Sequence, residues 1–236
     1  SKSIKFTIYC WIVGMIPALL TLKVSSDLSS ALVIMAITFG LTFIFNRTKK
    51  MHMVVLLTTV GLIAGYILHI KSNLPDPAHI DDYSYRIARI VAWLYPDRYS
   101  DAAYQSQTAL YSIGSGGFWG VGLGRMYVNI PEGQTDFIFV LLTHQLGIFG
   151  GICLILCYVY LLFQILKIAL NACSLYETIL VIGILIHIAT QVVVNMGVCT
   201  SLLPNTGLPL VLMSYGGSSI LTSFAELAIC VSVSKK

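Results

Sequence analysis

One carboxylate lies where a polar segment meets an apolar run. Residues 130–136 include Pro131 and Gly133 and end at Asp136, and an apolar stretch follows at once. Because Pro and Gly interrupt regular structure, we expect Asp136 in a loop at the start of a membrane helix. Partial burial there raises the pKa of a carboxyl group and makes it a better general base. A helix N-cap is the more ordinary role for Asp at such a position, so position alone favours a cap and leaves the catalytic role open.

Two other segments are rich in glycine and hydroxyl side chains. Residues 111–124 include a GxGxxG-like spacing, but no strand and no soluble βαβ unit surround it, so a dinucleotide site is excluded. Its glycines indicate close backbone approach, either to another helix or to a ligand. Residues 199–218 hold Pro204, Pro209 and several hydroxyls. They fit a re-entrant polar segment or a turn followed by a helix cap.

The composition indicates an all-α membrane protein. Of 236 residues, 57% are apolar and 10% are charged, whereas soluble domains are typically about 25% charged. A spanning helix needs roughly 20 apolar residues, which leaves room for about six spans and one large loop. The cysteines show no disulfide or metal-ligand pattern. We expect a single membrane domain over residues 1–236, with spans at 6–22, 31–46, 51–70, 137–166, 177–198 and 219–233.

Charge placement predicts the orientation. Eight of the 14 basic residues lie at the termini or in the two short links near residues 47–50 and 167, and eight of the ten acids lie on the opposite side. The positive-inside rule places both termini in the cytoplasm. The loop 71–136 is then extracytoplasmic, with amphipathic helices expected near residues 85–94 and 104–113. We expect Trp93, Tyr95 and Tyr99 at headgroup depth.

Two polar residues, His187 and Glu226, fall near the middle of the last two expected spans. An intramembrane carboxylate is costly unless it is paired. We therefore expect His187 and Glu226 to bond to each other.

Several motifs resemble those of the SEDS family of membrane proteins, whose members include RodA, FtsW and SpoVE. The resemblance runs in order along the chain, through the first turn at 26–31, the Tyr-Gln, Gln and Gly-Ser-Gly-Gly stretch at 104–117, and the Pro-Glu-x-x-Thr-Asp-Phe-Ile-Phe signature at 131–139. It continues through Asn-x-Gly at 195–197, residues 202–210 and Ser-Tyr-Gly-Gly-Ser-Ser at 214–219.

The resemblance implies a peptidoglycan glycosyltransferase that polymerises lipid II on the outer face of the bacterial cytoplasmic membrane. Asp136 matches the family's essential aspartate, which favours a catalytic role, and we assign it as the general base for the acceptor hydroxyl. The matching motifs place substrate binding at Gln105, Ser115, Gly116, Glu132, Thr135, Asn195, Ser214, Tyr215 and Ser218.

The leaving pyrophosphate needs cationic stabilisation. Arg86 and Arg89 are three residues apart and share a helix face, so we expect them to clamp it, although ordinary lipid headgroups are an alternative ligand. No metal site is predicted from the residues, but Mg²⁺ or Mn²⁺ is a candidate bridge between the pyrophosphate and Asp136 or Glu132.

The chain also departs from the family pattern. His144-Gln145 stand where the family has Glu-Glu, and the resemblance covers only the last six of about ten spans. A class B penicillin-binding protein is the implied partner. Two other functions remain open, namely a flippase for the lipid-linked precursor and a catalytically inactive scaffold for the transpeptidase.

Overall fold

The regular secondary structure of the described residues is all helical. The computed structural model describes residues 2–24, 28–45, 49–125 and 130–235. The turn at Asp27, the basic residue Arg47 and the terminal Lys236 lie outside the described residues. The helices are α1 (Lys2–Val24), α2 (Leu28–Phe45), α3 (Lys49–Ser72), the 3₁₀ helix η1 (Pro77–Asp82), α4 (Tyr85–Leu94), α5 (Ser100–Gly116), α6 (Ile138–Leu170), α7 (Leu175–Cys199) and α8 (Gly217–Ser234).

Each of the six expected spans is a helix. By length and apolar composition, α3, α6, α7 and α8 could each cross a membrane. The apolar segments Thr7–Lys23 of α1 and Ser29–Phe45 of α2 are shorter. Local signals explain some boundaries. The Ser174 side chain accepts a hydrogen bond from the Glu177 backbone N–H at 3.2 Å and so caps α7.

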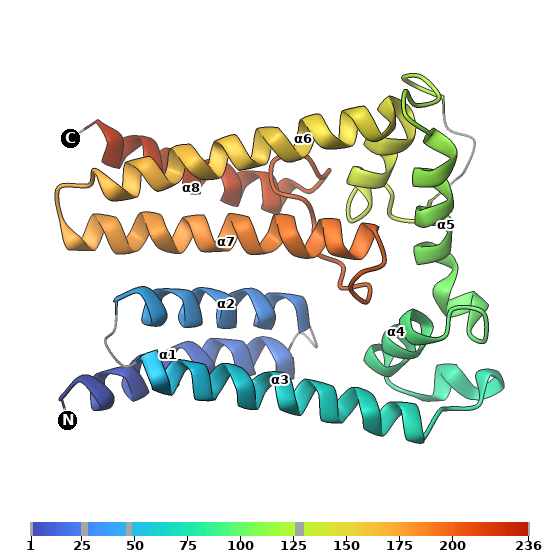
Figure 1. Ribbon diagram of the computed structural model, residues 1–236, viewed down its shortest axis with the longest axis horizontal. Coiled ribbons are helices and arrows are strands. Elements are labelled where there is room, and N and C mark those ends of the chain that lie inside the picture. Colours follow the sequence, from blue (N-terminus) through green and yellow to red (C-terminus); the bar gives the residue numbers. More distant parts are fainter. Residues whose placement is uncertain (1, 25–27, 46–48, 126–129, 236) are drawn as a thin grey trace.

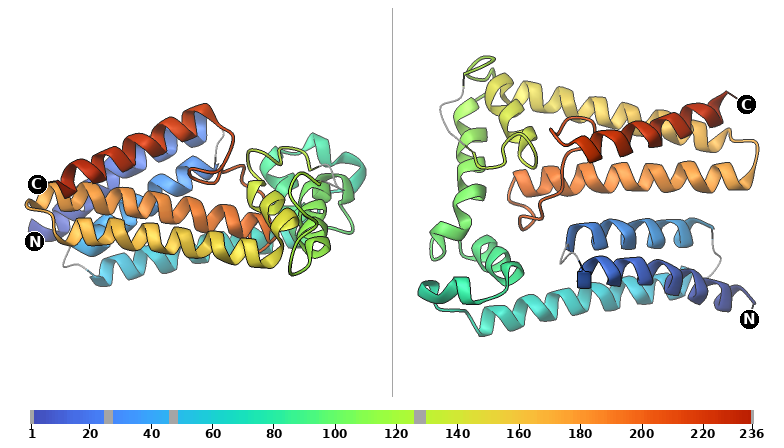
Figure 2. Two further views of the ribbon diagram at one scale, coloured as in Figure 1. Left: turned by 90° about the horizontal axis from the view of Figure 1, so that it is seen from above. Right: turned by 180° about the vertical axis from the view of Figure 1, so that it is seen from behind.

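The long apolar helices form two groups, which contact each other through α2 and α7. Figure 1 and Figure 2 show α1, α2 and α3 on one side and α6, α7 and α8 on the other, with α2 beside α7. The main buried cluster is built largely from α6 and α7, with residues from α2, α8 and the loops. Helices α4 and α5 lie at one end of the bundle, opposite the start of α1 and the end of α8. One end of the bundle therefore gathers the polar loops.

The glycine stretch near residue 116 is a packing contact between α5 and α6. A Cβ on Gly116 would lie 2.8 Å from the Thr143 carbonyl oxygen. Helix α6 is kinked at Gly147, where φ is +72°. A Cβ on Gly147 would lie 2.1 Å from the Phe118 carbonyl oxygen, and the Ile148 N–H donates to the Gly117 carbonyl at 3.0 Å. Close backbone packing thus accounts for these glycines.

The loop helices begin and end close to where the amphipathic pattern predicts. Helix α4 covers residues 85–94 as expected, and α5 includes 104–113. The residue Tyr99 is 3% exposed and packs in a small buried cluster with Val91 and Ala103, so its ring faces protein, and its depth in the membrane stays a prediction. The Tyr99 hydroxyl donates to the Pro75 carbonyl at 2.6 Å. This hydrogen bond links the residue before α5 to the segment that follows α3.

Candidate functional site

Asp136 lies at the end of a tight turn directly before α6. Its backbone N–H donates to the Glu132 carbonyl at 3.1 Å, and its side chain is half-buried. Burial raises the pKa of the Asp136 carboxyl group above its usual value. The negative charge of Glu132 raises this pKa further, and the positive charge of Arg89 opposes both effects. A carboxylate in this setting is a stronger base than a fully hydrated one.

The loop between α7 and α8 is hydrogen-bonded to the backbone of the Asp136 turn. The Tyr215 backbone N–H donates to the Gln134 carbonyl at 2.9 Å. The next carbonyl, that of Thr135, accepts a 2.5 Å hydrogen bond from the Ser214 hydroxyl. The same hydroxyl accepts from the Leu210 N–H at 2.6 Å. Ser214 is therefore placed as a positioning residue for the turn.

Asn195 holds the same turn from α7. Its side-chain amide donates to the carbonyls of Asp136 and Leu208, both at 2.7 Å. The Asn195 residue is 1% exposed, and its bond to the Leu208 carbonyl is buried. Together with Ser214 and Tyr215, this amide fixes three consecutive carbonyls, which orients the Asp136 side chain.

Arg89 and the Asp136 carboxylate both lie beside Gly207. A Cβ on Gly207 would be 3.4 Å from Asp136 Oδ2 and 3.7 Å from Arg89 Nη1, so both charged groups border the space beside this glycine. Arg89 Nη1 donates to the Asn205 carbonyl at 3.0 Å. Its guanidinium stacks 4.1 Å above the centre of the Tyr85 ring and also bonds to the Tyr85 hydroxyl. The cation is held beside the carboxylate without an ion pair to it.

Arg86 points to a different part of the molecule. Its Nη2 donates to the Leu22 carbonyl near the end of α1, at 3.1 Å. One turn and two turns further along α4, Arg89 and Trp93 bond instead to the carbonyls of Asn205 and Ser201. The structure therefore does not bring Arg86 and Arg89 together, and α4 links α1 to the α7–α8 loop.

Gln105 joins the site through Asn205, a residue that the sequence motifs did not single out. The Asn205 amide donates to Gln105 Oε1 at 2.9 Å, and Asn205 Oδ1 accepts from the Gly207 N–H at 3.2 Å. Asn is a common turn residue for this reason. The Pro-Asn-x-Gly sequence at 204–207 was the available signal, and it indicated a turn without indicating its contacts to Arg89 and Gln105.

A cavity beside the Asp136 turn contains three of the expected substrate-binding residues. Its volume is about 280 Å³, and Glu132, Thr135 and Tyr215 contribute to its lining. The Thr135 hydroxyl donates to the Glu132 carboxylate at 2.9 Å. The Tyr215 residue is 78% exposed. These side chains are accessible to a ligand that approaches from the end of the bundle.

Three expected site residues take other positions. Ser115 bonds to the Ser112 carbonyl at 3.1 Å and lies 3.3 Å from Nδ1 of His144, while Gly116 packs on α6 as described above. Ser218 is an exposed residue in the first turn of α8. The structure places Ser115 and Gly116 at the α5–α6 contact, away from the hydrogen bonds that hold the Asp136 turn.

The described residues offer limited metal ligation. No group of three or more His, Cys, Asp or Glu side chains gathers there in a way that could hold a metal ion. Asp136 and Glu132 are close enough to influence each other electrostatically. Mg²⁺ typically takes one or two carboxylates and completes its shell with water and substrate phosphates, so this pair fits a cation that arrives with a phosphorylated substrate.

These observations define a polytopic helical membrane protein with a half-buried carboxylate held in a loop at one end of the bundle. A family model described as cell cycle protein, FtsW/RodA/SpoVE, matches residues 1–236. The chain belongs to this family.

Individual relatives agree with the family assignment. The chain is 40% identical over 155 residues to stage V sporulation protein E of Bacillus subtilis, covering 64% of this chain and 42% of the relative. It is 35% identical over 227 residues to a probable peptidoglycan glycosyltransferase FtsW of Thioalkalivibrio sulfidiphilus, covering 93% of this chain and 53% of the relative.

A solved structure is similar as well. It is described as "Structural coordination of polymerization and crosslinking by a peptidoglycan synthase complex", and one of its chains matches with a TM-score of 0.70 and 28% identity. The match covers 92% of this chain and 57% of that chain. The chain thus spans about half the length of the relatives it matches.

Proposed function

We propose that this chain acts as a peptidoglycan glycosyltransferase that polymerises lipid II. The observation that carries the proposal is the half-buried Asp136 carboxylate, whose turn is held by hydrogen bonds and which lies near Arg89 beside Gly207. The relative from Thioalkalivibrio named probable peptidoglycan glycosyltransferase FtsW supports the substrate class.

Asp136 serves as the general base in this proposal. The acceptor sugar hydroxyl attacks the anomeric carbon of the donor and gives its proton to the Asp136 carboxylate. The new glycosidic C–O bond forms as the bond from that carbon to the pyrophosphate breaks. The lipid pyrophosphate leaves with the electron pair of the broken C–O bond.

Arg89 stabilises the leaving pyrophosphate. A guanidinium binds phosphate oxygens through two parallel hydrogen bonds, and Arg89 is close enough to Asp136 to affect its pKa. Arg86 contributes by anchoring α4 on α1. If Mg²⁺ or Mn²⁺ takes part, Asp136 and Glu132 would bind it, and it would neutralise pyrophosphate charge.

The remaining residues divide into ligand contacts and positioning residues. Glu132, Thr135 and Tyr215 line the cavity beside the turn and contact the sugar or peptide of the substrate. Gln105 acts through Asn205. Asn195 and Ser214 act on the turn backbone.

The membrane setting and partner follow from the family. The apolar helices and the family match support a location in the bacterial cytoplasmic membrane. We propose that both termini are cytoplasmic and that the Asp136 end of the bundle faces outward. The partner is a class B penicillin-binding protein, and the similar synthase complex supports this assignment.

The test is lipid II polymerisation by the purified chain in detergent, with and without its cognate transpeptidase. Glycan strands seen on a gel support a glycosyltransferase. Transport of labelled lipid II across a vesicle membrane without glycan strands would favour the flippase. Transpeptidase binding without either activity would favour the scaffold.

A further inference from the structure

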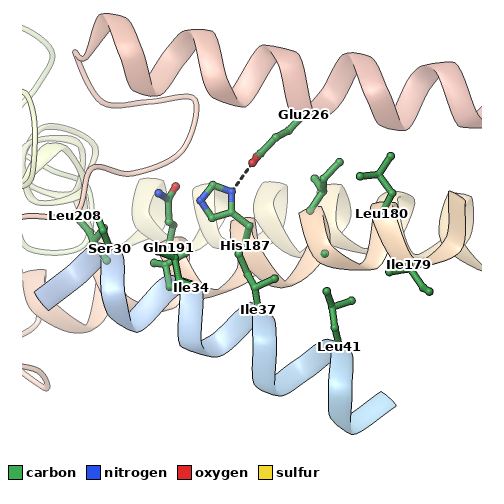
Figure 3. Close-up of a pocket in the computed structure, with 13 residues that line it drawn as sticks. Ser30, Ile34, Ile37, Leu41, Ile179, Leu180, His187, Gln191, Leu208 and Glu226 are labelled. Carbon is green, nitrogen blue, oxygen red and sulfur yellow. Dashed lines mark hydrogen bonds and ion pairs between the residues drawn. The ribbon is translucent and has the colours of Figure 1, made fainter. Parts of the chain in front are cut away.

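Helix α7 carries the amide that holds the Asp136 turn, and it is itself fixed in the bundle. It packs on α2, α5, α6 and α8, and many of its apolar side chains belong to the main buried cluster. Figure 3 shows a polar contact near its middle, where Nδ1 of His187 and Oε1 of Glu226 on α8 are 2.5 Å apart. This bond confirms the pairing expected from the sequence. Groups attached to α7 are therefore attached to the best-supported helix of the bundle.

The end of α7 presents a backbone carbonyl to α4. Ser201 lies two residues beyond the helix in a left-handed conformation (φ +55°), which commonly follows a helix end. The Ser201 N–H donates to the Val198 carbonyl at 2.9 Å, and the Leu203 N–H donates to the Gly197 carbonyl at 3.0 Å. Both bonds tie the start of the α7–α8 loop to the last turn of α7. The Ser201 carbonyl is therefore fixed relative to the helix.

Trp93 binds this carbonyl from α4. Its indole Nε1–H donates to the Ser201 carbonyl at 2.8 Å. One turn earlier on α4, Arg89 Nη1 donates to the Asn205 carbonyl at 3.0 Å. Among the described residues, the backbone of α4 packs with η1, α3 and α5 but not with α7. The Trp93 bond is therefore a direct connection between α4 and the end of α7.

Two attachment points determine the orientation of α4 better than one. Arg89 and Trp93 are four residues apart, which corresponds to about 6 Å along the helix axis. The carbonyls that they bind, those of Asn205 and Ser201, are also four residues apart. A helix held to this loop through Arg89 alone can turn about that one bond. With the Trp93 bond also present, the same movement has to break or lengthen a second hydrogen bond.

The carboxylate and the cation of the site are thus both placed from α7. The Asn195 amide of α7 holds the Asp136 carbonyl at 2.7 Å, and the carbonyl just beyond the same helix holds Trp93. A Cβ on Gly207 would lie within 3.4 Å of Asp136 Oδ2 and 3.7 Å of Arg89 Nη1. Because the two groups are this close to one glycine, a small rotation of α4 changes the distance between them.

We propose that Trp93 is a positioning residue, which holds Arg89 beside Asp136 by docking α4 on the end of α7. Trp93 itself does not contact the substrate and acts through Arg89. The effect of this positioning on the reaction rests on the proposed glycosyltransferase function. The position of Arg89 can be measured without any activity, so the two proposals can fail separately.

The first test is nuclear magnetic resonance of the chain labelled with ¹⁵N-arginine in detergent micelles. Hydrogen bonds slow the rotation of a guanidinium and the exchange of its protons with water, so a held arginine gives sharp Nη signals. Arg89→Gln and Arg86→Gln identify the two sets of signals from α4 among the five arginines. We expect Trp93→Phe to broaden or abolish the Arg89 signals. Those of Arg86, which donates to the Leu22 carbonyl, should stay sharp.

The matched control is Trp119→Phe. Trp119 is 74% exposed, and its side chain makes no hydrogen bond to any described residue. This variant should leave the Arg89 signals unchanged. Sharp Arg89 signals in Trp93→Phe, or equal losses in both variants, would overturn the proposal. Loss of the Arg86 signals as well in Trp93→Phe would also overturn it, because Trp93 would then support the whole of α4 and not the position of Arg89.

The second test is a double-mutant cycle in lipid II polymerisation. Trp93→Phe should lower kcat by about 2–10-fold, as expected for the loss of one neutral hydrogen bond, and change KM by less than about 2-fold. Because Trp93 acts through Arg89, the variant with both Trp93→Phe and Arg89→Gln should be no slower than Arg89→Gln alone. Effects that multiply would contradict the proposal. A wild-type chain that forms no glycan strands would refute the proposed function and not this inference, which the arginine signals test independently.

Discussion

Replacing Asn195 with leucine removes two hydrogen bonds while keeping a side chain of similar size. The lost bonds are those to the carbonyls of Asp136 and Leu208, both 2.7 Å long. Side-chain hydrogen bonds in membrane proteins contribute about 0.6 kcal/mol on average and up to about 1.7 kcal/mol. Two such bonds therefore give a loss of about 1–3 kcal/mol. The Cys199 thiol, 3.7 Å from the Asp136 carbonyl, is too weak a donor to replace the amide.

The assay is thermal unfolding of the purified chain in detergent. For a chain of this size, about 1–3 kcal/mol corresponds to a fall in Tm of about 2–12 °C. Because Asp136 loses its support, glycan synthesis should also fall, by about 10–100-fold.

The matched control for Asn195→Leu is Gln191→Leu. It replaces an amide one turn earlier on α7 that makes no hydrogen bond to any described residue. Its free energy of unfolding should change by less than about 0.5 kcal/mol. If Asn195→Leu unfolds at the wild-type temperature, or if the control loses as much stability, the inference that Asn195 holds the Asp136 turn is refuted.

Further predictions concern the charges at the site and the kink in α6. With Asp136 as the proposed general base, only its ionised form is active, so we expect activity to be lost as pH falls through the raised pKa of that group. Glu132→Gln should move this acidic limb of the rate profile to lower pH and Arg89→Gln to higher pH; shifts in the same direction would contradict the assigned charges. Gly147→Ala should destabilise the chain by about 2–4 kcal/mol in thermal unfolding, because its Cβ would meet backbone and its φ is positive. Gly61→Ala in α3 meets nothing within 4 Å and should leave Tm unchanged or slightly raised.

The sequence predicted the helices well because apolar length is a strong local signal. All six apolar segments are helices, and α4 covers the residues that the amphipathic pattern indicated. The position of Asp136 was predictable for a similar reason, since Pro131 and Gly133 interrupt the chain before an apolar run. The burial of Tyr99 was not predictable, and the reason is tertiary. An aromatic residue in a loop suits an interface as well as a small core, and only packing against Val91 and Ala103 decides between them.

Contacts between distant segments could not be predicted. Arg86 and Arg89 share one face of α4, yet one meets the end of α1 and the other meets the α7–α8 loop. Asn195 and Ser214 belong to recognisable motifs. Their hydrogen bonds to the turn carbonyls depend on how α7 and the α7–α8 loop fold around Asp136. Motif spacing indicates which residues matter without indicating whether they touch a ligand or support a neighbour.

The most direct test of the central claim is the rate of lipid II polymerisation by the wild-type chain and by Asp136→Asn, with matched amounts of folded protein and with the cognate transpeptidase present. The asparagine keeps the size of the side chain and the backbone bond to Asn195 but cannot accept the proton. We expect Asp136→Asn to lose at least about 100-fold in rate while its Tm stays close to that of the wild type. Glycan strands formed by Asp136→Asn at the wild-type rate would contradict the assignment of Asp136 as the general base.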